Sequence, residues 1–71
     1  MNEGKFKKGD MVTWFLLYDG YILKSKGSGI VVSSSKHTFF NPPSYSYRVY
    51  RNEFKDIMIF EEHEIENFKG D

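Results

Sequence analysis

The side chains best suited to acid–base or nucleophilic chemistry in this chain are its two histidines. His37 follows a run of serines at positions 33–35, and a serine activated by a histidine is a common nucleophile. Such a site also needs a carboxylate that orients the histidine and a sharp turn that presents the serine, and no such turn motif accompanies these serines. We therefore predict no catalytic residue and expect that the protein is not an enzyme.

Four glutamates surround the second histidine and concentrate metal-ligand atoms near the end of the chain. The cluster consists of Glu61, Glu62, His63, Glu64 and Glu66. Paired histidines at a short fixed spacing, or an Asp-rich loop with its glycine, would indicate a metal site. The cluster has neither pattern, so we interpret it as a solvated acidic turn and predict no metal and no cofactor.

The charges of the chain balance overall but not locally. Residues 1–52 carry eight basic and three acidic side chains, a net charge of +5, whereas residues 53–71 carry two basic and seven acidic ones, a net charge of −5. A basic face with aromatic rings neutralises phosphates and stacks bases, as in proteins that bind single-stranded nucleic acid. The candidates for such a face are Lys24, Lys26, Lys36, Arg48 and Arg51. A pI of about 6.7 argues against a strongly basic domain.

Aromatic side chains are more numerous than a small core can enclose. The chain has 13 of them among 71 residues, and aromatic residues are enriched at the centres of protein interfaces. The candidates for an exposed patch are Trp14, Phe39, Phe40, Tyr45, Tyr47 and Tyr50. The alternative is that most of these rings pack the core and its rim. Self-association is a third way to use surplus aromatics in a small domain.

The alternation of apolar and polar residues predicts short β-strands. We expect strands over residues 11–18, 29–36, 46–51 and 55–60, a helical or 3₁₀ turn over 61–64 and a closing strand over 65–68. The connections are a long loop over 19–29, preferred to a tight Asp-Gly hairpin, and a loop over 37–44 that contains two prolines. Period-two alternation predicts that the inward residues are Val12, Leu16, Ile30, Val32, Val49, Ile57 and Ile59.

Two short motifs in this order resemble the opening of SH3-like barrels of the KOW and Tudor type. The first is Phe6-Lys7-Lys8-Gly9-Asp10-Met11-Val12-Thr13-Trp14 and the second is Gly27-Ser28-Gly29-Ile30-Val31-Val32. In that superfamily, a basic-x-Gly-Asp-x-Val start leads to a Gly-x-Gly-x-Val second strand. Residues 47–50 and 64–65 are similar to its third strand and its terminal turn. The resemblance spans residues 6–68 and implies a small five-stranded barrel of the kind that bacteriophages and bacteria encode as free-standing proteins.

These features predict one all-β domain. We expect an N-terminal arm over residues 1–8, an SH3-like barrel over 9–68 and a tail over 69–71. The absence of cysteine excludes disulfides and thiolate zinc sites, and the longest apolar run, residues 14–18, is too short to cross a membrane. We therefore expect a cytoplasmic protein, or one in the host cytoplasm if it is viral.

The predicted function is that of a small binding module without catalytic activity. We expect it to contact a protein partner through the aromatic residues around positions 39–50 and the first loop. The alternative is a nucleic-acid-binding barrel that uses the basic residues, and a homo-oligomer is compatible with both.

Overall fold

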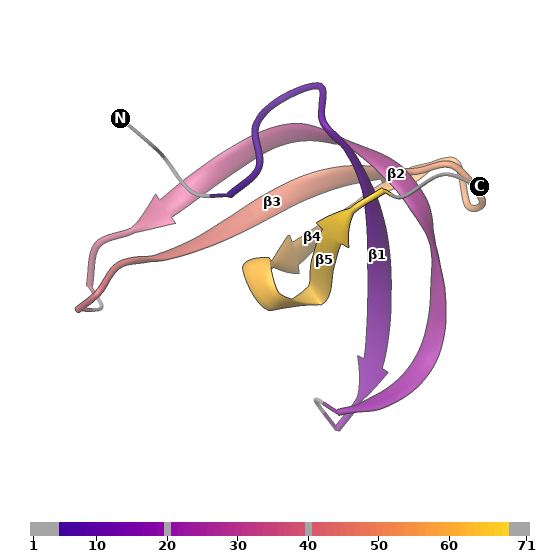
Figure 1. The fold of residues 1–71 in the computed structure, drawn as a ribbon, viewed down its shortest axis with the longest axis horizontal. Helices are drawn as coiled ribbons and strands as arrows, with labels where there is room; N and C mark the ends of the chain where they lie inside the picture. Colours follow the sequence, from indigo (N-terminus) through magenta and orange to yellow (C-terminus); the bar gives the residue numbers. More distant parts are fainter. Residues whose placement is uncertain (1–4, 20, 40, 69–71) are drawn as a thin grey trace.

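The computed structural model describes residues 5–19, 21–39 and 41–68, which form one antiparallel sheet of five strands (Figure 1). The strands are β1 (Met11–Tyr18), β2 (Ile22–His37), β3 (Ser44–Arg51), β4 (Asp56–Glu61) and β5 (Ile65–Asn67). A 3₁₀ turn, η1 (Glu62–Glu64), joins β4 to β5. The strand order is β4-β3-β2-β1-β5. The prediction of an all-β fold with five strands and a short turn before the last strand is confirmed.

Strand β2 is much longer than the sequence pattern predicts, with 16 residues. The predicted loop over residues 19–29 is wrong, because the polar segment 24–29 belongs to β2 and pairs with β1 as far as Tyr18 opposite Ile22. Asp19 adopts a left-handed φ of 55° at the hairpin end, where the Tyr21 N–H donates a 3.3 Å hydrogen bond to the Tyr18 carbonyl. Backbone pairing with the apolar strand β1 therefore overrides the loop-like composition of this segment.

The core lies on one face of the strongly curved sheet and is lined by all five strands. Its buried residues are Phe6, Val12, Trp14, Val31, Tyr47, Val49, Phe60 and Ile65, with Leu16, Tyr45 and Met58 packed against them. Among the predicted core residues, Val12 and Val49 are fully buried, and Leu16 is partly buried against the cluster. Those three predictions are confirmed.

The predicted inward face is wrong in β2 and β4. Ile30, Ile57 and Ile59 are exposed, and Val32 lies partly buried at the irregularity where the pairing of β2 with β3 shifts register. The inward side chains are those of the alternate residues Val31, Met58 and Phe60. Both strands are apolar on both faces at these positions, so alternation alone does not indicate which face is buried.

The segment before β1 is part of the packed structure. The Phe6 ring is buried and meets the Tyr47 ring edge-on, with 5.4 Å between the ring centres. Residues 7–10 then form a turn closed by a 2.9 Å hydrogen bond from the Asp10 N–H to the Lys7 carbonyl. Gly9 has φ 95° in this turn, a value that favours glycine. Residues 5–8 of the predicted arm therefore help to close one end of the core.

Candidate binding surface

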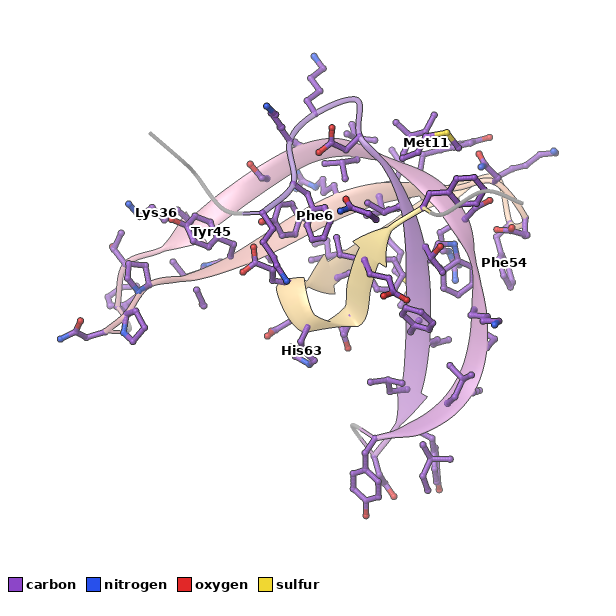
Figure 2. The ribbon with its side chains drawn as sticks, in the orientation of Figure 1. Phe6, Met11, Lys36, Tyr45, Phe54 and His63 are labelled. Carbon is purple, nitrogen blue, oxygen red and sulfur yellow. The ribbon has the colours of Figure 1, made fainter. Side chains whose placement is uncertain are left out.

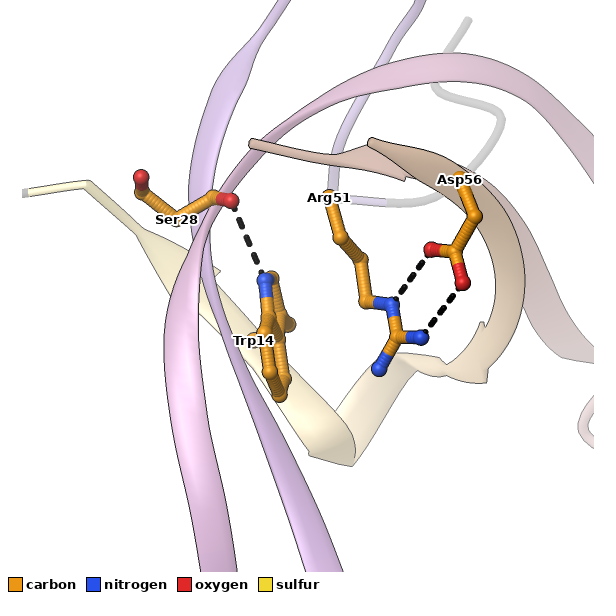
Figure 3. Close-up of polar contacts among 4 residues, drawn as sticks. All are labelled: Trp14, Ser28, Arg51 and Asp56. Carbon is orange, nitrogen blue, oxygen red and sulfur yellow. Dashed lines mark hydrogen bonds and ion pairs between the residues drawn. The ribbon is translucent and has the colours of Figure 1, made fainter. Parts of the chain in front are cut away.

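Trp14 belongs to the core and not to a surface patch. Its side chain is fully buried, and its Nε1–H donates a 3.0 Å hydrogen bond to the Ser28 carbonyl (Figure 3). The indole stacks on Phe60, with 5.8 Å between the ring centres and 24° between the planes. Tyr47 is likewise buried. The alternative that aromatic residues pack the core thus holds for both of these candidates.

The other aromatic candidates do not share one face. Tyr45 packs partly buried against the core on the same side of β3 as Tyr47, whereas Tyr50 points to the opposite face of that strand. Phe39 is 98% exposed in the connection between β2 and β3. Phe40 lies outside the described residues. The strand register therefore places the predicted aromatic residues on different faces of the sheet, so they do not form one patch.

A different apolar surface follows from the same register. Met11 lies opposite Ile30, Ile30 opposite Tyr50, and Tyr50 opposite Ile57, so one row crosses β1, β2, β3 and β4 on the face away from the core. Ile59 is the next residue on this face of β4. We call Met11, Ile30, Tyr50, Ile57 and Ile59 the outer strip. Four of its members are exposed, by 39% at Ile30 to 59% at Ile59, and Tyr50 is partly buried between them.

The outer strip is a continuous surface because its members are neighbours in the sheet. Residues directly opposite one another on paired strands have Cβ atoms about 4.5–5.5 Å apart. Soluble proteins rarely leave wide contiguous apolar patches in water, and such patches often mark interaction sites. Sequence reasoning named Tyr50 but placed Ile30, Ile57 and Ile59 in the core, which concealed the strip. The outer strip becomes visible only when β2 is paired with β3 in the correct register.

A second exposed apolar group lies at the end of the β1–β2 hairpin. It consists of Tyr18, Tyr21, Ile22 and Leu23, which are 51–79% exposed. Figure 1 shows this hairpin end projecting from the rest of the sheet. These residues flank a turn and are not held side by side across several strands, unlike the members of the outer strip.

Arg51 is part of a structural cluster at the β3–β4 turn (Figure 3). Its guanidinium donates hydrogen bonds of 2.8 and 2.7 Å to the two carboxylate oxygens of Asp56, and lies 4.1 Å from the centre of the Phe54 ring and 5.1 Å from that of Trp14. The hydrogen bonds from Arg51 lower the pKa of Asp56, and those to Asp56 raise the pKa of Arg51. A buried, doubly hydrogen-bonded and stacked arginine holds the turn in place.

Glu53 connects the same turn to β2. Its carboxylate accepts hydrogen bonds of 3.1 and 3.0 Å from the Ser28 N–H and one of 3.2 Å from the Ser28 hydroxyl. The bonds from the Ser28 backbone lower the pKa of Glu53. A Cβ atom at Gly27 would overlap both this carboxylate and the Trp14 ring. Close packing around this carboxylate and the Trp14 ring thus explains the glycine at position 27, and the hydrogen bonds explain the serine at position 28.

The predicted basic residues do not converge on one face. Lys24, Lys26, Lys36 and Arg48 are exposed, whereas Arg51 is buried and paired. Arg48 and Lys26 alternate with inward residues and so lie on the same face as the outer strip. Lys36 lies opposite Tyr45 on the other face. Among the predicted basic residues on the outer face, Arg48 lies nearest to Tyr50 along the chain, two residues away in β3.

His37 contacts a serine that sequence reasoning did not single out. Its Nε2 lies 2.9 Å from the Ser46 hydroxyl oxygen, because the β2–β3 register places Ser46 opposite Ser35, two residues from His37 along β2. A shallow hollow beside this pair is lined by His37, Asn41, Pro42, Ser44 and Glu61. Among residues 5–19, 21–39 and 41–68, no carboxylate hydrogen-bonds to the imidazole, so the pair lacks the third group that orients a catalytic histidine.

The acidic turn forms hydrogen bonds with other parts of the same chain. The Glu62 carboxylate accepts 2.7 Å hydrogen bonds from the Lys5 N–H and from the Tyr47 hydroxyl. Burial and the hydrogen bond to Glu62 raise the pKa of Tyr47 to about 12. Within the part of the chain that the structure describes, no three histidine or acidic side chains gather as metal ligands would. Glu62 thus ties the segment before β1 to the 3₁₀ turn.

No protein-family model, no curated protein and no solved structure matches the chain. In the described residues, no helix has the length and apolar character needed to span a membrane.

Proposed function

We propose that the chain is a small SH3-like barrel that serves as a binding module without catalytic activity. The strand order, with β5 returning to pair with β1, and the 3₁₀ turn before β5 support the fold assignment. The curvature of the sheet around a single core is also typical of small barrels (Figure 1). A role as an accessory protein of a bacteriophage or bacterium stays a prediction.

The module binds a protein partner through the outer strip. The observation that carries this proposal is the in-register row of apolar side chains across four strands, with a tyrosine at its centre. A partly buried tyrosine between exposed aliphatic residues provides a rigid apolar surface with a polar end, as at the centres of protein interfaces. Arg48 beside the strip favours a partner with an acidic group at the edge of its own apolar surface.

A photoreactive phenylalanine analogue in place of Tyr50 tests this proposal in the source cells. The expected result is a cross-linked product that contains this chain and one other protein, identified by mass spectrometry. The control places the same analogue at Tyr21, which is exposed at the hairpin end and lies outside the outer strip. No cross-link at position 50, or the same protein captured equally at both positions, would contradict the proposal.

Single-stranded nucleic acid is the second candidate ligand, because Lys26, Arg48 and Tyr50 share the outer face. With Arg51 buried, this face offers two of the predicted cations. The logarithm of the affinity for an oligonucleotide should then fall with the logarithm of salt concentration with a slope of about −1.4, since each phosphate contact contributes about −0.7. Absence of binding at low salt would remove this candidate.

A further inference from the structure

Strand β4 ends the sheet on one side and has a free edge. In the described chain, β4 pairs with β3 alone, and β5 forms the other end of the sheet. The two ends differ, because β5 has three residues with exposed Glu66 and Asn67, whereas β4 has six residues with exposed Ile57 and Ile59. An edge strand presents unpaired N–H and C=O groups that can pair with another strand.

The sequence of β4 and the residue before it is complementary to itself in the antiparallel direction. Residues 55–61 read Lys-Asp-Ile-Met-Ile-Phe-Glu. When two copies pair about Met58, Ile57 of each lies opposite Ile59 of the other, and Lys55 of each lies opposite Glu61 of the other. Ile57, Ile59 and Glu61 share the outer parity of β4, so the apolar pairs form on the same face as Glu61. Lys55 is the turn residue before the strand, with φ 55°, and its charge lies at the start of β4.

The surface of β4 is suited to such pairing. Lys55, Ile57, Ile59 and Glu61 are all exposed. In the described residues, neither Lys55 nor Glu61 forms an ion pair, since the acidic and basic groups of this region that do so are Asp56 and Arg51. Figure 2 shows the side chains of the sheet and their distribution around its curved strands. The charge of Lys55 is therefore available to a second strand, whereas the exposed Glu61 carboxylate also caps the 3₁₀ turn by accepting a hydrogen bond from the Glu64 N–H.

We propose that two copies of this chain pair antiparallel through the β4 edges, about a two-fold axis at Met58, to give one ten-stranded sheet. The axis is perpendicular to the sheet, so the outer faces of both copies lie on the same side. The two outer strips then meet at the paired isoleucines. The dimer does not depend on the proposed function, and either can fail alone.

Charge exchange at Lys55 and Glu61 tests the dimer by sedimentation at concentrations up to the millimolar range. The wild type should dimerise, and Lys55→Glu or Glu61→Lys alone should dimerise at least about tenfold more weakly, because each places two like-charged pairs in the contact. A mixture of the two single variants should form the heterodimer, and the double variant should regain self-association. Circular dichroism confirms that each variant is folded.

Lys26→Glu and Glu66→Lys provide the matched control. They change the net charge by the same amounts at exposed positions away from β4. Each control variant should self-associate like the wild type, because its β4 edge is unchanged. Self-association weakened as much in the control variants as in Lys55→Glu and Glu61→Lys, or left unchanged in Lys55→Glu and Glu61→Lys, would overturn the proposal. A wild-type chain that stays monomeric would also overturn it and would leave the β4 edge to a strand from another protein.

Cysteine cross-linking tests the register independently, since the chain contains no cysteine. Directly opposed residues of a sheet lie within about 4.5–5.5 Å between Cβ atoms, close to disulfide reach. A mixture of Ile57→Cys and Ile59→Cys chains should therefore form a disulfide-linked dimer faster than either variant alone. Equal rates in the mixture and in the separate variants would contradict pairing about Met58.

Discussion

The Arg51 guanidinium and the Asp56 carboxylate form two hydrogen bonds, 2.8 and 2.7 Å long, across the end of the β3–β4 hairpin. The arginine is buried beneath Phe54, whereas the side chain of Asp56 is about half exposed. A buried guanidinium without its carboxylate would lose its partner in a poorly solvated position. The stability of the hairpin end therefore depends on the charge of the Asp56 carboxylate.

Acid should weaken the fold through this carboxylate. The hydrogen bonds from Arg51 hold the pKa of Asp56 below its ordinary value of 3.8, so its stabilising contribution is present above that value and is lost as the pH falls through the lower, folded-state pKa. Urea unfolding of the wild type and Asp56→Asn between neutral pH and pH 2 measures this contribution. The difference in unfolding free energy between the two proteins should shrink in acid. A constant difference would contradict the assigned role.

Alkali should weaken the fold through Tyr47. The pKa of this phenol is raised from 10.0 to about 12, first by burial and then by the hydrogen bond to Glu62. The folded chain thus binds this proton more tightly than the unfolded chain, and stability is lost as the pH rises from 10 towards 12. In an absorbance titration, Tyr47 should ionise last of the five tyrosines. Tyr47→Phe should remove that last phase, and its persistence would refute the assignment.

Truncation of side chains on the two faces of β4 should lower the unfolding free energy by very different amounts. Phe60→Ala should cost about 3–5 kcal/mol, because it opens a cavity in the core. Ile59→Ala should cost less than about 1 kcal/mol, because the side chain is 59% exposed. Thermal or urea unfolding measures both values. A larger cost at Ile59 than at Phe60 would mean that the faces of this strand are reversed.

Alanine substitutions at two glycines should distinguish a constraint on the backbone dihedral angle φ from a constraint on packing space. Gly9→Ala places a side chain in a backbone with φ 95° but in open space, and should cost about 1–2 kcal/mol. At Gly29, a Cβ atom would overlap the Tyr50 carbonyl oxygen and the Val49 side chain, so the strands themselves must move. Gly29→Ala should therefore be the more destabilising of the two in urea unfolding. The reverse order would contradict the described packing of β2 on β3.

Sequence reasoning predicted the strand content of this chain better than the faces of its strands. Residues 11–18 are predicted as a strand and form β1, because β-branched and aromatic residues fill it between two turn signals. The faces of Ile30-Val31-Val32 and of Ile57-Met58-Ile59-Phe60 depend on register, and β2 shifts register between Val31 and Ser33. A bulge of this kind leaves no mark in the apolar pattern.

The candidate site was hidden by the same ambiguity. An isoleucine is assigned to the core by composition, so the exposed positions of Ile30, Ile57 and Ile59 become visible only with the pairing of the strands. The opposite error concerns Trp14, a residue type frequent at interfaces that here is fully buried. The sequence groups Arg51 with the surface cations, because it does not show that Phe54 and Trp14 enclose this side chain.

The most direct test of the outer strip is the dissociation constant for the protein captured from position 50, measured by calorimetry. Tyr50→Ala and Ile30→Ser should weaken binding by about tenfold or more, as expected at an interface centre, while each variant keeps its thermal transition. Tyr21→Ala, at the exposed hairpin end, should change the constant by less than about twofold. Wild-type affinity in both strip variants, or loss of binding in Tyr21→Ala alone, would contradict the account.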